Sequence, residues 1–216
     1  MIRLEHLYKH YPSPQGGERA VLEDFSLELP EQGAVCLFGP SGCGKTTLLH
    51  ILAGLIQPDR GTVAGLEGKR LSMVFQEDRL LPWLTAAQNV ALALPGSGAL
   101  PKREKLDAAR NLLQQLGLEE AADQKPDQLS GGMQRRVAIA RAMARAFNHQ
   151  GGVLLLDEPF KGLDGAVKEQ VIRQTAQLKR EALILFVTHD LEEARALADR
   201  TLCFSGPPLA LKEERA

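Results

Sequence analysis

The stretch that decides the fold is AVCLFGPSGCGKTTLLHILAGL, residues 34–55. It begins with a short apolar run, continues through a turn that matches G-x-x-x-x-G-K-[ST], and ends in a segment typical of a helix. In such a turn the glycines let backbone N–H groups close around phosphate oxygens, and the start of the helix adds positive potential. The stretch therefore predicts a strand, a phosphate-binding loop and a helix. A glycine-rich turn with a solvated lysine is the alternative, which the flanking strand and helix disfavour.

The turn also supplies the residues expected to hold a nucleoside triphosphate. Lys45 is placed to reach the β- and γ-phosphates and Thr46 to ligate magnesium. The further loop residues that we expect to contact the nucleotide are Gly39, Ser41, Gly42, Cys43, Gly44 and Thr47.

Cys43 has two interpretations. It lies near a helix N-terminus, a setting that can make a thiol reactive, but it can also be a small residue that fits the turn. As a hypothesis, a thiol reagent on Cys43 would block ATP binding sterically. Unchanged ATP affinity after complete labelling would contradict it.

Two more apolar runs end in polar residues. VLLL (153–156) precedes Asp157-Glu158, and LILFVT (183–188) precedes His189. Such runs indicate buried parallel strands, whose carboxyl ends meet at one edge where ligands gather. We expect Asp157 to hold the metal and Glu158 to orient or deprotonate the attacking water. The alternative is a pair of surface carboxylates at a strand end.

The remaining segments complete an α/β fold. IRLEHLYKHY (2–11) and VLEDFSLELPEQG (21–33) alternate polar and apolar residues, which predicts an antiparallel β-layer beside the main sheet. Residues 77–150 read as mostly helical, with a loop at 95–98. In the segment 102–118 the leucines share one helical face: Leu106, Leu112, Leu113 and Leu116.

Composition excludes several functional classes. The 216 residues are 44% hydrophobic and 25% charged, which suits one globular domain, and the net charge of -1 gives no bulk attraction to nucleic acid or anionic lipid. Three cysteines without a C-x-x-C pair indicate neither a disulfide framework nor a zinc site. The N-terminus lacks the apolar core of a signal peptide, and no apolar run approaches the roughly 20 residues that cross a bilayer. We therefore expect a cytoplasmic chain whose role at a membrane would need a separate membrane-embedded partner.

A predicted helix from Gly131 carries a basic stripe, made of Arg135, Arg136, Arg141 and Arg145. Nucleic-acid binding is disfavoured because the chain is not basic overall and no aromatic residues interleave with the arginines. We expect a solvated or ion-paired helix face.

Together the motifs resemble those of ATP-binding cassette ATPases over nearly the whole chain. The phosphate loop, VFQEDRLLPW (74–83), LSGGMQRR (129–136), LLLDEP (154–159), Gly162-Leu163-Asp164 and VTHD (187–190) occur in that family's order and spacing. The resemblance implies a P-loop NTPase core with a mostly parallel sheet, an N-terminal antiparallel β-layer and a helical signature subdomain. It implies a single domain, 1–216, with the helical subdomain inserted at about 77–150. It also implies a transporter ATPase that works as a dimer, with two ATP molecules sandwiched at the interface.

The resemblance assigns roles to residues that the motifs alone leave open. Gln76 matches the glutamine that touches magnesium and relays to the membrane domain, and His189 matches the histidine at the γ-phosphate. The alternative for Gln76 is a solvated loop amide. Tyr11 matches the aromatic that stacks on adenine, although it can also be a half-exposed strand aromatic, and Tyr8 competes for the role.

The implied catalytic residues are Glu158, His189 and Lys45, and the implied magnesium ligands are Thr46, Gln76 and Asp157. The residues implied to act on ATP held by the other protomer are Ser130, Gly131, Gly132, Gln134 and Asp164. Where this chain has Lys161-Gly162, the family more often has serine-alanine, so the turn across the interface departs from the usual pattern.

One segment resembles a particular branch of the family. FQEDRLLPWLTAAQNVAL (75–92) is similar to the corresponding segment of nitrate, sulfonate and taurine type importers, which receives the membrane subunit's coupling helix. This implies contacts of two permease subunits near Gln76–Trp83, at Leu80, Leu81, Pro82 and Trp83. It also implies an indirect partnership with a solute-binding protein and a place on the inner face of the cell membrane. For Trp83 the alternative is core packing.

Other functions remain open at this stage. The ending TLCFSGPPLALKEERA (201–216) departs from the importer branch, so an exporter or a lipoprotein-release system is an alternative. A cassette that acts on nucleic acid or ribosomes is disfavoured, because those relatives usually carry two cassettes or a long coiled coil.

Overall fold

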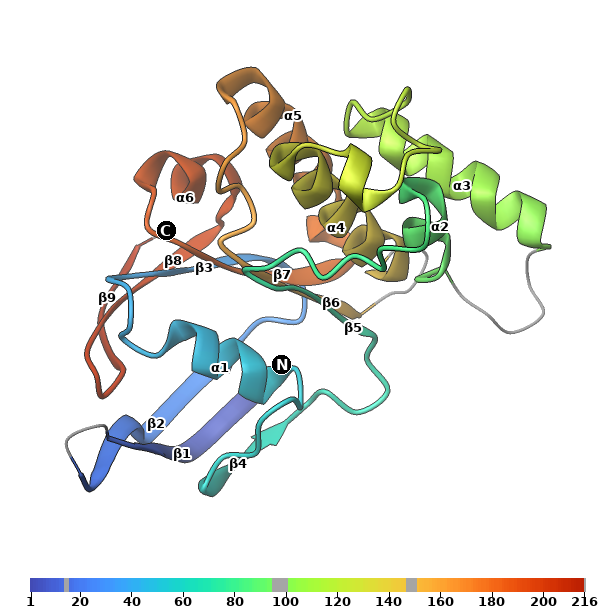
Figure 1. Cartoon of the computed structure of the whole chain (residues 1–216). Helices are drawn as coiled ribbons and strands as arrows, with labels where there is room; N and C mark the ends of the chain where they lie inside the picture. The colour runs from blue at the N-terminus through green and yellow to red at the C-terminus, as the bar shows by residue number, and fades with distance from the viewer. Residues whose placement is uncertain (14–15, 95–100, 147–150, 216) are drawn as a thin grey trace.

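The computed structural model describes residues 1–13, 16–94, 101–146 and 151–215. Figure 1 shows a central sheet between two layers: helices cover one face, and a smaller sheet with helix α1 lies against the other. Each face has its own apolar core.

The central sheet has six strands in the order β5-β6-β7-β3-β8-β9. Their bounds are β3 Gly33–Phe38, β5 Leu71–Val74, β6 Gly152–Asp157, β7 Ala182–Thr188, β8 Arg200–Ser205 and β9 Ala210–Arg215. Neighbours from β5 to β8 pair in parallel, and β9 alone pairs antiparallel, with β8. All residues of β6 and β7 are buried, as expected for strands covered on both faces. The three predicted strands are therefore confirmed.

The smaller sheet has the order β2-β1-β4, formed by β1 Ile2–Pro12, β2 Glu18–Leu29 and β4 Arg60–Ala64. It is antiparallel, which confirms the predicted β-layer. Its third strand, β4, was not predicted. Helix α1, Lys45–Leu52, packs between this sheet and the central one through apolar residues such as Leu48 and Leu49.

The helical face carries α2 Ala86–Ala91, α3 Lys102–Gln115, α4 Gly131–Ala146, α5 Gly165–Ala176 and α6 Leu191–Leu197. Short 3₁₀ turns lie at Pro126–Gln128 and Gln177–Arg180. The predicted leucine face is confirmed, because Leu112, Leu113 and Leu116 are buried and Leu106 packs against the same core. The loop predicted at 95–98 lies outside the described residues. The division of 77–150 into a separate subdomain stays a prediction.

Among the described residues, no helix combines the length and the hydropathy that crossing a membrane requires.

Candidate nucleotide-binding site

The loop between β3 and α1 is closed around a lysine. Lys45 is buried, and its ammonium donates to the carbonyl oxygens of Gly39, at 2.9 Å, and of Pro40, at 2.8 Å. Gly44, at φ +117°, caps α1 in a conformation that a larger residue rarely adopts. A Cβ on Gly39 would lie 2.6 Å from the Phe204 carbonyl oxygen. The loop therefore holds its lysine and its backbone N–H groups ready for an anion.

A cleft of about 280 Å³ opens above this loop, at the carboxyl ends of β3, β6 and β7. The predicted residues that line it are Tyr11, Gly39, Ser41, Gly42, Gly44, Lys45, Thr46, Thr47, Gln76, Asp157, Glu158 and His189. The phosphate loop, Gln76, Asp157-Glu158 and His189, widely separated along the chain, thus meet at one edge of the sheet.

Four lining residues were not among the predicted contacts, namely Arg19 and Val21 on β2 and Val187 and Thr188 at the end of β7. Tyr11 pairs with Arg19 across the β1–β2 ladder, so the antiparallel hairpin itself was the available signal. Tyr8, although described, does not line the cleft. Tyr11 therefore has the position expected of a base-stacking aromatic.

Cys43 is a described residue that does not line the cleft. Its side chain is fully buried in the core beneath α1 and lies 3.5 Å from the Lys45 nitrogen. This placement fits the interpretation of a small residue within the turn. A thiol reagent would have to open the loop before it reached the sulfur.

The proposed magnesium ligands lie together. The Thr46 hydroxyl donates to Asp157 Oδ2 at 2.8 Å, and the exposed Gln76 side chain lines the same cleft. Burial raises the pKa of Asp157, although its hydrogen bond from Thr46 acts in the opposite direction. A hydroxyl, an amide oxygen and a carboxylate are oxygen donors that suit Mg²⁺. A cation would also favour the ionised form of this buried carboxylate.

Glu158 has a partner on each carboxylate oxygen. Lys161 Nζ lies 2.9 Å from Oε2, and His189 Nδ1 lies 3.4 Å from Oε1. Burial favours the protonated acid, but the hydrogen bond and charge of Lys161, with His189, outweigh it and lower the pKa of Glu158. The His189 side chain is 64% exposed, so it is free to meet a ligand entering the cleft.

The arginines of α4 bear out their prediction only in part. Arg135 is buried and donates to the carbonyl oxygens of Asp157 and Glu158, at 2.6 and 2.7 Å, and of Pro159, at 2.9 Å. Arg136, Arg141 and Arg145 also donate to backbone carbonyls of neighbouring segments. The expected solvated or ion-paired face holds only in part: Arg135 pairs with Asp78 and Arg145 is exposed, but the stripe is mainly engaged with backbone carbonyls. Guanidinium groups here satisfy loop carbonyls that secondary structure leaves open.

The residues expected to act across an interface form a separate surface. None of Ser130, Gly131, Gly132, Gln134 and Asp164, all described, lines the cleft. Ser130, Gly131 and Asp164 are exposed, and Gly132 borders the 162–164 turn, since a Cβ on it would lie 3.4 Å from the Gly162 oxygen. Gln134 differs, because its amide donates to Pro126 and Leu129 carbonyls of its own chain.

Trp83 is 66% exposed, so the core-packing alternative is wrong. The loop that presents it is held by the buried Asn89, whose side chain accepts from the Leu81 N–H at 2.8 Å and donates to the Leu81 and Leu84 carbonyls. The exposed indole therefore stands on a rigid turn.

Comparison with known proteins agrees with this geometry. The family model described as ABC transporter matches residues 22–161. The chain is 43% identical over 203 residues to the taurine import ATP-binding protein TauB of Pseudomonas aeruginosa, which covers 90% of this chain and 75% of that protein. It is 40% identical to the nitrate import ATP-binding protein NrtD of Synechococcus elongatus, over 94% of this chain and 75% of that protein.

A solved structure supports the same relationship. The dimeric, post-hydrolysis structure of the ATP-binding cassette MJ0796 bound to ADP and Pi superposes with a TM-score of 0.87 at 31% identity, covering 100% of this chain and 98% of that one. The chain belongs to the ABC transporter family, as one of its ATP-hydrolysing cassettes.

Proposed function

We propose that the chain is the ATPase subunit of an importer for a small anionic solute. The similar import proteins named for taurine and nitrate support this class of cargo. One observation carries the mechanism: Ser130, Gly131 and Asp164 are exposed, and none of them lines the nucleotide cleft of its own chain. Two copies facing each other would complete two sites, each from one cleft and one set of these residues.

In each site this chain's residues have distinct tasks. Lys45 and the loop N–H groups bind the β- and γ-phosphates, and Tyr11 stacks on the adenine. Thr46, Asp157 and Gln76 would hold Mg²⁺, which neutralises charge on the phosphates. Glu158 accepts a proton from the attacking water, and His189 contacts the γ-phosphate.

The γ-phosphate links hydrolysis to movement. The partner copy contacts it through its Ser130 hydroxyl and the N–H groups at the start of α4, where the helix dipole favours an anion. The diphosphate lacks this contact, so ATP favours the closed pair and hydrolysis reopens it. Closure and reopening would drive an attached membrane dimer between its two states.

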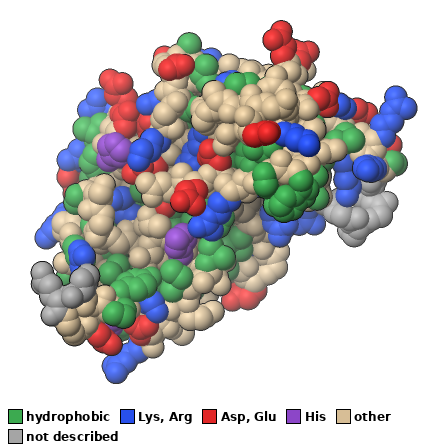
Figure 2. Space-filling view, viewed as in Figure 1, with side chains coloured by type: hydrophobic (Ala, Val, Ile, Leu, Met, Phe, Trp, Pro, Cys, Tyr) green, Lys and Arg blue, Asp and Glu red, His purple; other side chains and the backbone are tan. Residues whose placement is uncertain are grey.

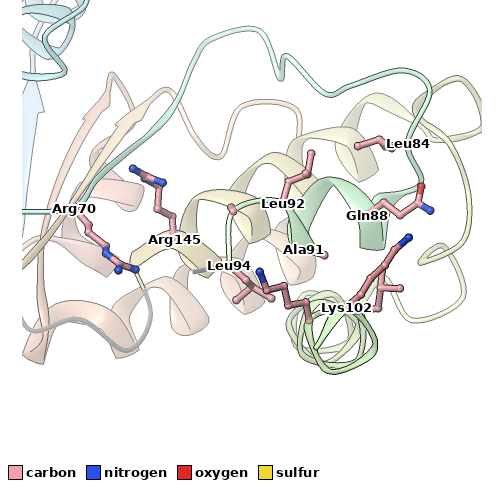
Figure 3. Close-up of a pocket in the computed structure, with 11 residues that line it drawn as sticks. Arg70, Leu84, Gln88, Ala91, Leu92, Leu94, Lys102 and Arg145 are labelled. Atoms are coloured by element: carbon pink, nitrogen blue, oxygen red, sulfur yellow. The ribbon is translucent and has the colours of Figure 1, made fainter. Parts of the chain in front are cut away.

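A groove that includes Leu84, the residue after Trp83, supports a permease contact, although none of Leu80, Leu81, Pro82 and Trp83 lines it. It measures about 580 Å³ and combines apolar side chains with cations, its described lining being Arg70, Leu84, Gln88, Ala91, Leu92, Ala93, Leu94, Lys102, Lys105, Leu106 and Arg145. Figure 3 shows Arg70 and Arg145 at one end and Lys102 at the other, with Leu92 and Leu94 between them. In Figure 2 apolar side chains gather beneath α2, with Lys and Arg side chains around them.

This combination fits an amphipathic helix with acidic residues. We therefore assign the groove of each of the two protomers to a cytoplasmic loop of one of the two permease subunits. The proposal places the chain in the cytoplasm, at the inner face of the membrane. It also treats the helical segment of about 77–150 as the subdomain that carries this groove within one domain, 1–216. A solute-binding protein would act through the permease alone.

Replacement of the proposed base tests the function. Glu158→Gln should bind ATP with unchanged affinity, accumulate as a dimer and release phosphate very slowly, because the amide cannot take the proton from water. Size-exclusion chromatography with ATP and a phosphate-release assay measure both effects. Near-normal turnover would refute the assignment of Glu158.

The importer assignment has a separate test in the neighbouring coding sequences. Adjacent genes for a membrane subunit and a periplasmic-type binding protein would support import and narrow the cargo. A neighbouring gene that fuses a membrane domain of exporter type would instead favour export.

A further inference from the structure

Lys161 stands where the chain departs from the serine-alanine of its family, and it touches the proposed base. Its ammonium lies 2.9 Å from Glu158 Oε2, while His189 Nδ1 lies 3.4 Å from Oε1. Both oxygens of the carboxylate are therefore engaged in the single protomer. Each carboxylate oxygen can accept more than one hydrogen bond, but the two contacts together fix the direction of the carboxylate, and a general base needs one oxygen directed at its water.

The backbone of Glu158 cannot supply that freedom. The Glu158 N–H donates to the Val187 carbonyl at 3.1 Å, and its own carbonyl accepts from Arg135 Nη2 at 2.7 Å. The Lys161 N–H closes the turn on the same carbonyl at 3.3 Å. With the main chain fixed on both sides, the direction of the Glu158 side chain is set by what its carboxylate contacts.

The Lys161 side chain is accessible to a partner copy that could displace it from Glu158. This side chain is 60% exposed, against 17% for Glu158. Lys161 directly precedes Gly162, whose carbonyl borders Gly132 at the start of α4. The 161–164 loop thus lies at the edge of the surface that would face a partner copy, and a partner bound to that surface would contact the loop.

We propose that Lys161 is a positioning residue that holds the Glu158 carboxylate away from the attacking water in the separate protomer and releases it when the dimer closes. This inference rests on the proposed role of Glu158 as the base. It makes the ion pair a restraint on premature hydrolysis: closure by ATP costs the breaking of the pair, and only the closed state frees the base.

Turnover of the full chain tests the inference. Phosphate release is measured with Mg-ATP at protein concentrations well below those that saturate the dimer, where breaking the ion pair on closure limits turnover. Lys161→Ala should raise kcat by about two- to fivefold, the range expected for a partly exposed pair, and leave KM for ATP within about twofold. Lys161→Arg keeps the charge and should restore the parental kcat, which a loss of packing would not explain.

Arg173→Ala is the matched control, because it removes an exposed cation paired with Glu169 at 3.7 Å on α5, and it should change neither constant. An unchanged or lower kcat in Lys161→Ala would overturn the inference. So would a KM raised more than about fivefold, which would make Lys161 a phosphate ligand instead.

Combining the variants separates this inference from the proposed function. Glu158→Gln should abolish the gain of Lys161→Ala in the double variant, because no base is left to release. If Glu158→Gln alone retains turnover, the proposed function fails at its base. If Glu158→Gln is inactive while Lys161→Ala shows no gain, only the role of Lys161 fails.

Discussion

Arg135→Ala should destabilise this protein more than the alanine replacement of any other arginine on α4. The side chain donates to the carbonyls of Phe75, Asp157, Glu158 and Pro159 and pairs with Asp78 at 3.0 Å. Only 4% of the residue is exposed, so the truncation leaves buried carbonyls and a carboxylate without their partner. Removing one member of a buried pair costs about 3–5 kcal/mol, which we take as the expected loss in free energy of unfolding.

For a chain of this size each kcal/mol lowers Tm by roughly 2–4 °C, so the expected drop is about 6–20 °C. Urea titration with circular dichroism measures the free energy, and a thermal scan gives Tm. Arg145→Ala on the same helix is the control: that side chain is exposed, donates to the Leu71 carbonyl at 2.8 Å, and should cost about 1 kcal/mol or less. A loss below about 1 kcal/mol for Arg135→Ala would refute the view that this guanidinium holds the segments 75–78 and 157–159 against α4.

Two further predictions concern the proposed interfaces. Ser130→Arg should leave the ATP affinity of the single protomer within about twofold, as measured by titration calorimetry. Phosphate release should fall at least about 100-fold, because the contact with the γ-phosphate held by the partner copy is lost. An equal loss of ATP binding would count against action across the interface. The double variant Lys102→Glu, Lys105→Glu should no longer co-purify with permease subunits co-expressed from the neighbouring genes, and its ATP affinity should be unchanged. Arg103→Glu is the control and should leave the complex intact, because Arg103 lies on the same helix but does not line the groove. A complex that survives the double reversal would show that the groove is not the docking site.

Much of the fold was predictable because its central strands are buried on both faces. Such strands read as unbroken apolar runs, as in VLLL before Asp157, and their ends carry the polar residues of the cleft. Strand β4 was missed because nearly all of its residues are exposed. It is stabilised by pairing with β1, in which Leu4 is the partner of Val63, more than fifty residues later in the chain. A peripheral strand of this kind leaves no local periodicity to detect.

The candidate site was predictable to the extent that motifs fix backbone shape. The glycines of the phosphate loop and the position of Thr46 after it define a local geometry, and Asp157 and Glu158 follow from the end of a strand. Arg19 belongs to none of the motifs. It lines the cleft because it is the strand partner of Tyr11 across the β1–β2 hairpin.

By itself the sequence determined the phosphate loop, the buried strands and the order of the motifs, since each depends on residues close together in the chain. Only the tertiary structure decided what single side chains do. Arg135 is buried and hydrogen-bonded because its carbonyl partners, up to 60 residues away in sequence, converge on it. Lys161 contacts Glu158 because a tight turn brings the two side chains together. Trp83 is exposed because the buried Asn89 fixes its loop outward. The partners of Arg135 come from segments distant in sequence, which local patterns do not encode. Lys161 and Trp83 lie near Glu158 and Asn89 in sequence, but the turns that bring them together are fixed by tertiary contacts, such as those of Val187 and Arg135 with the Glu158 main chain and the burial of Asn89.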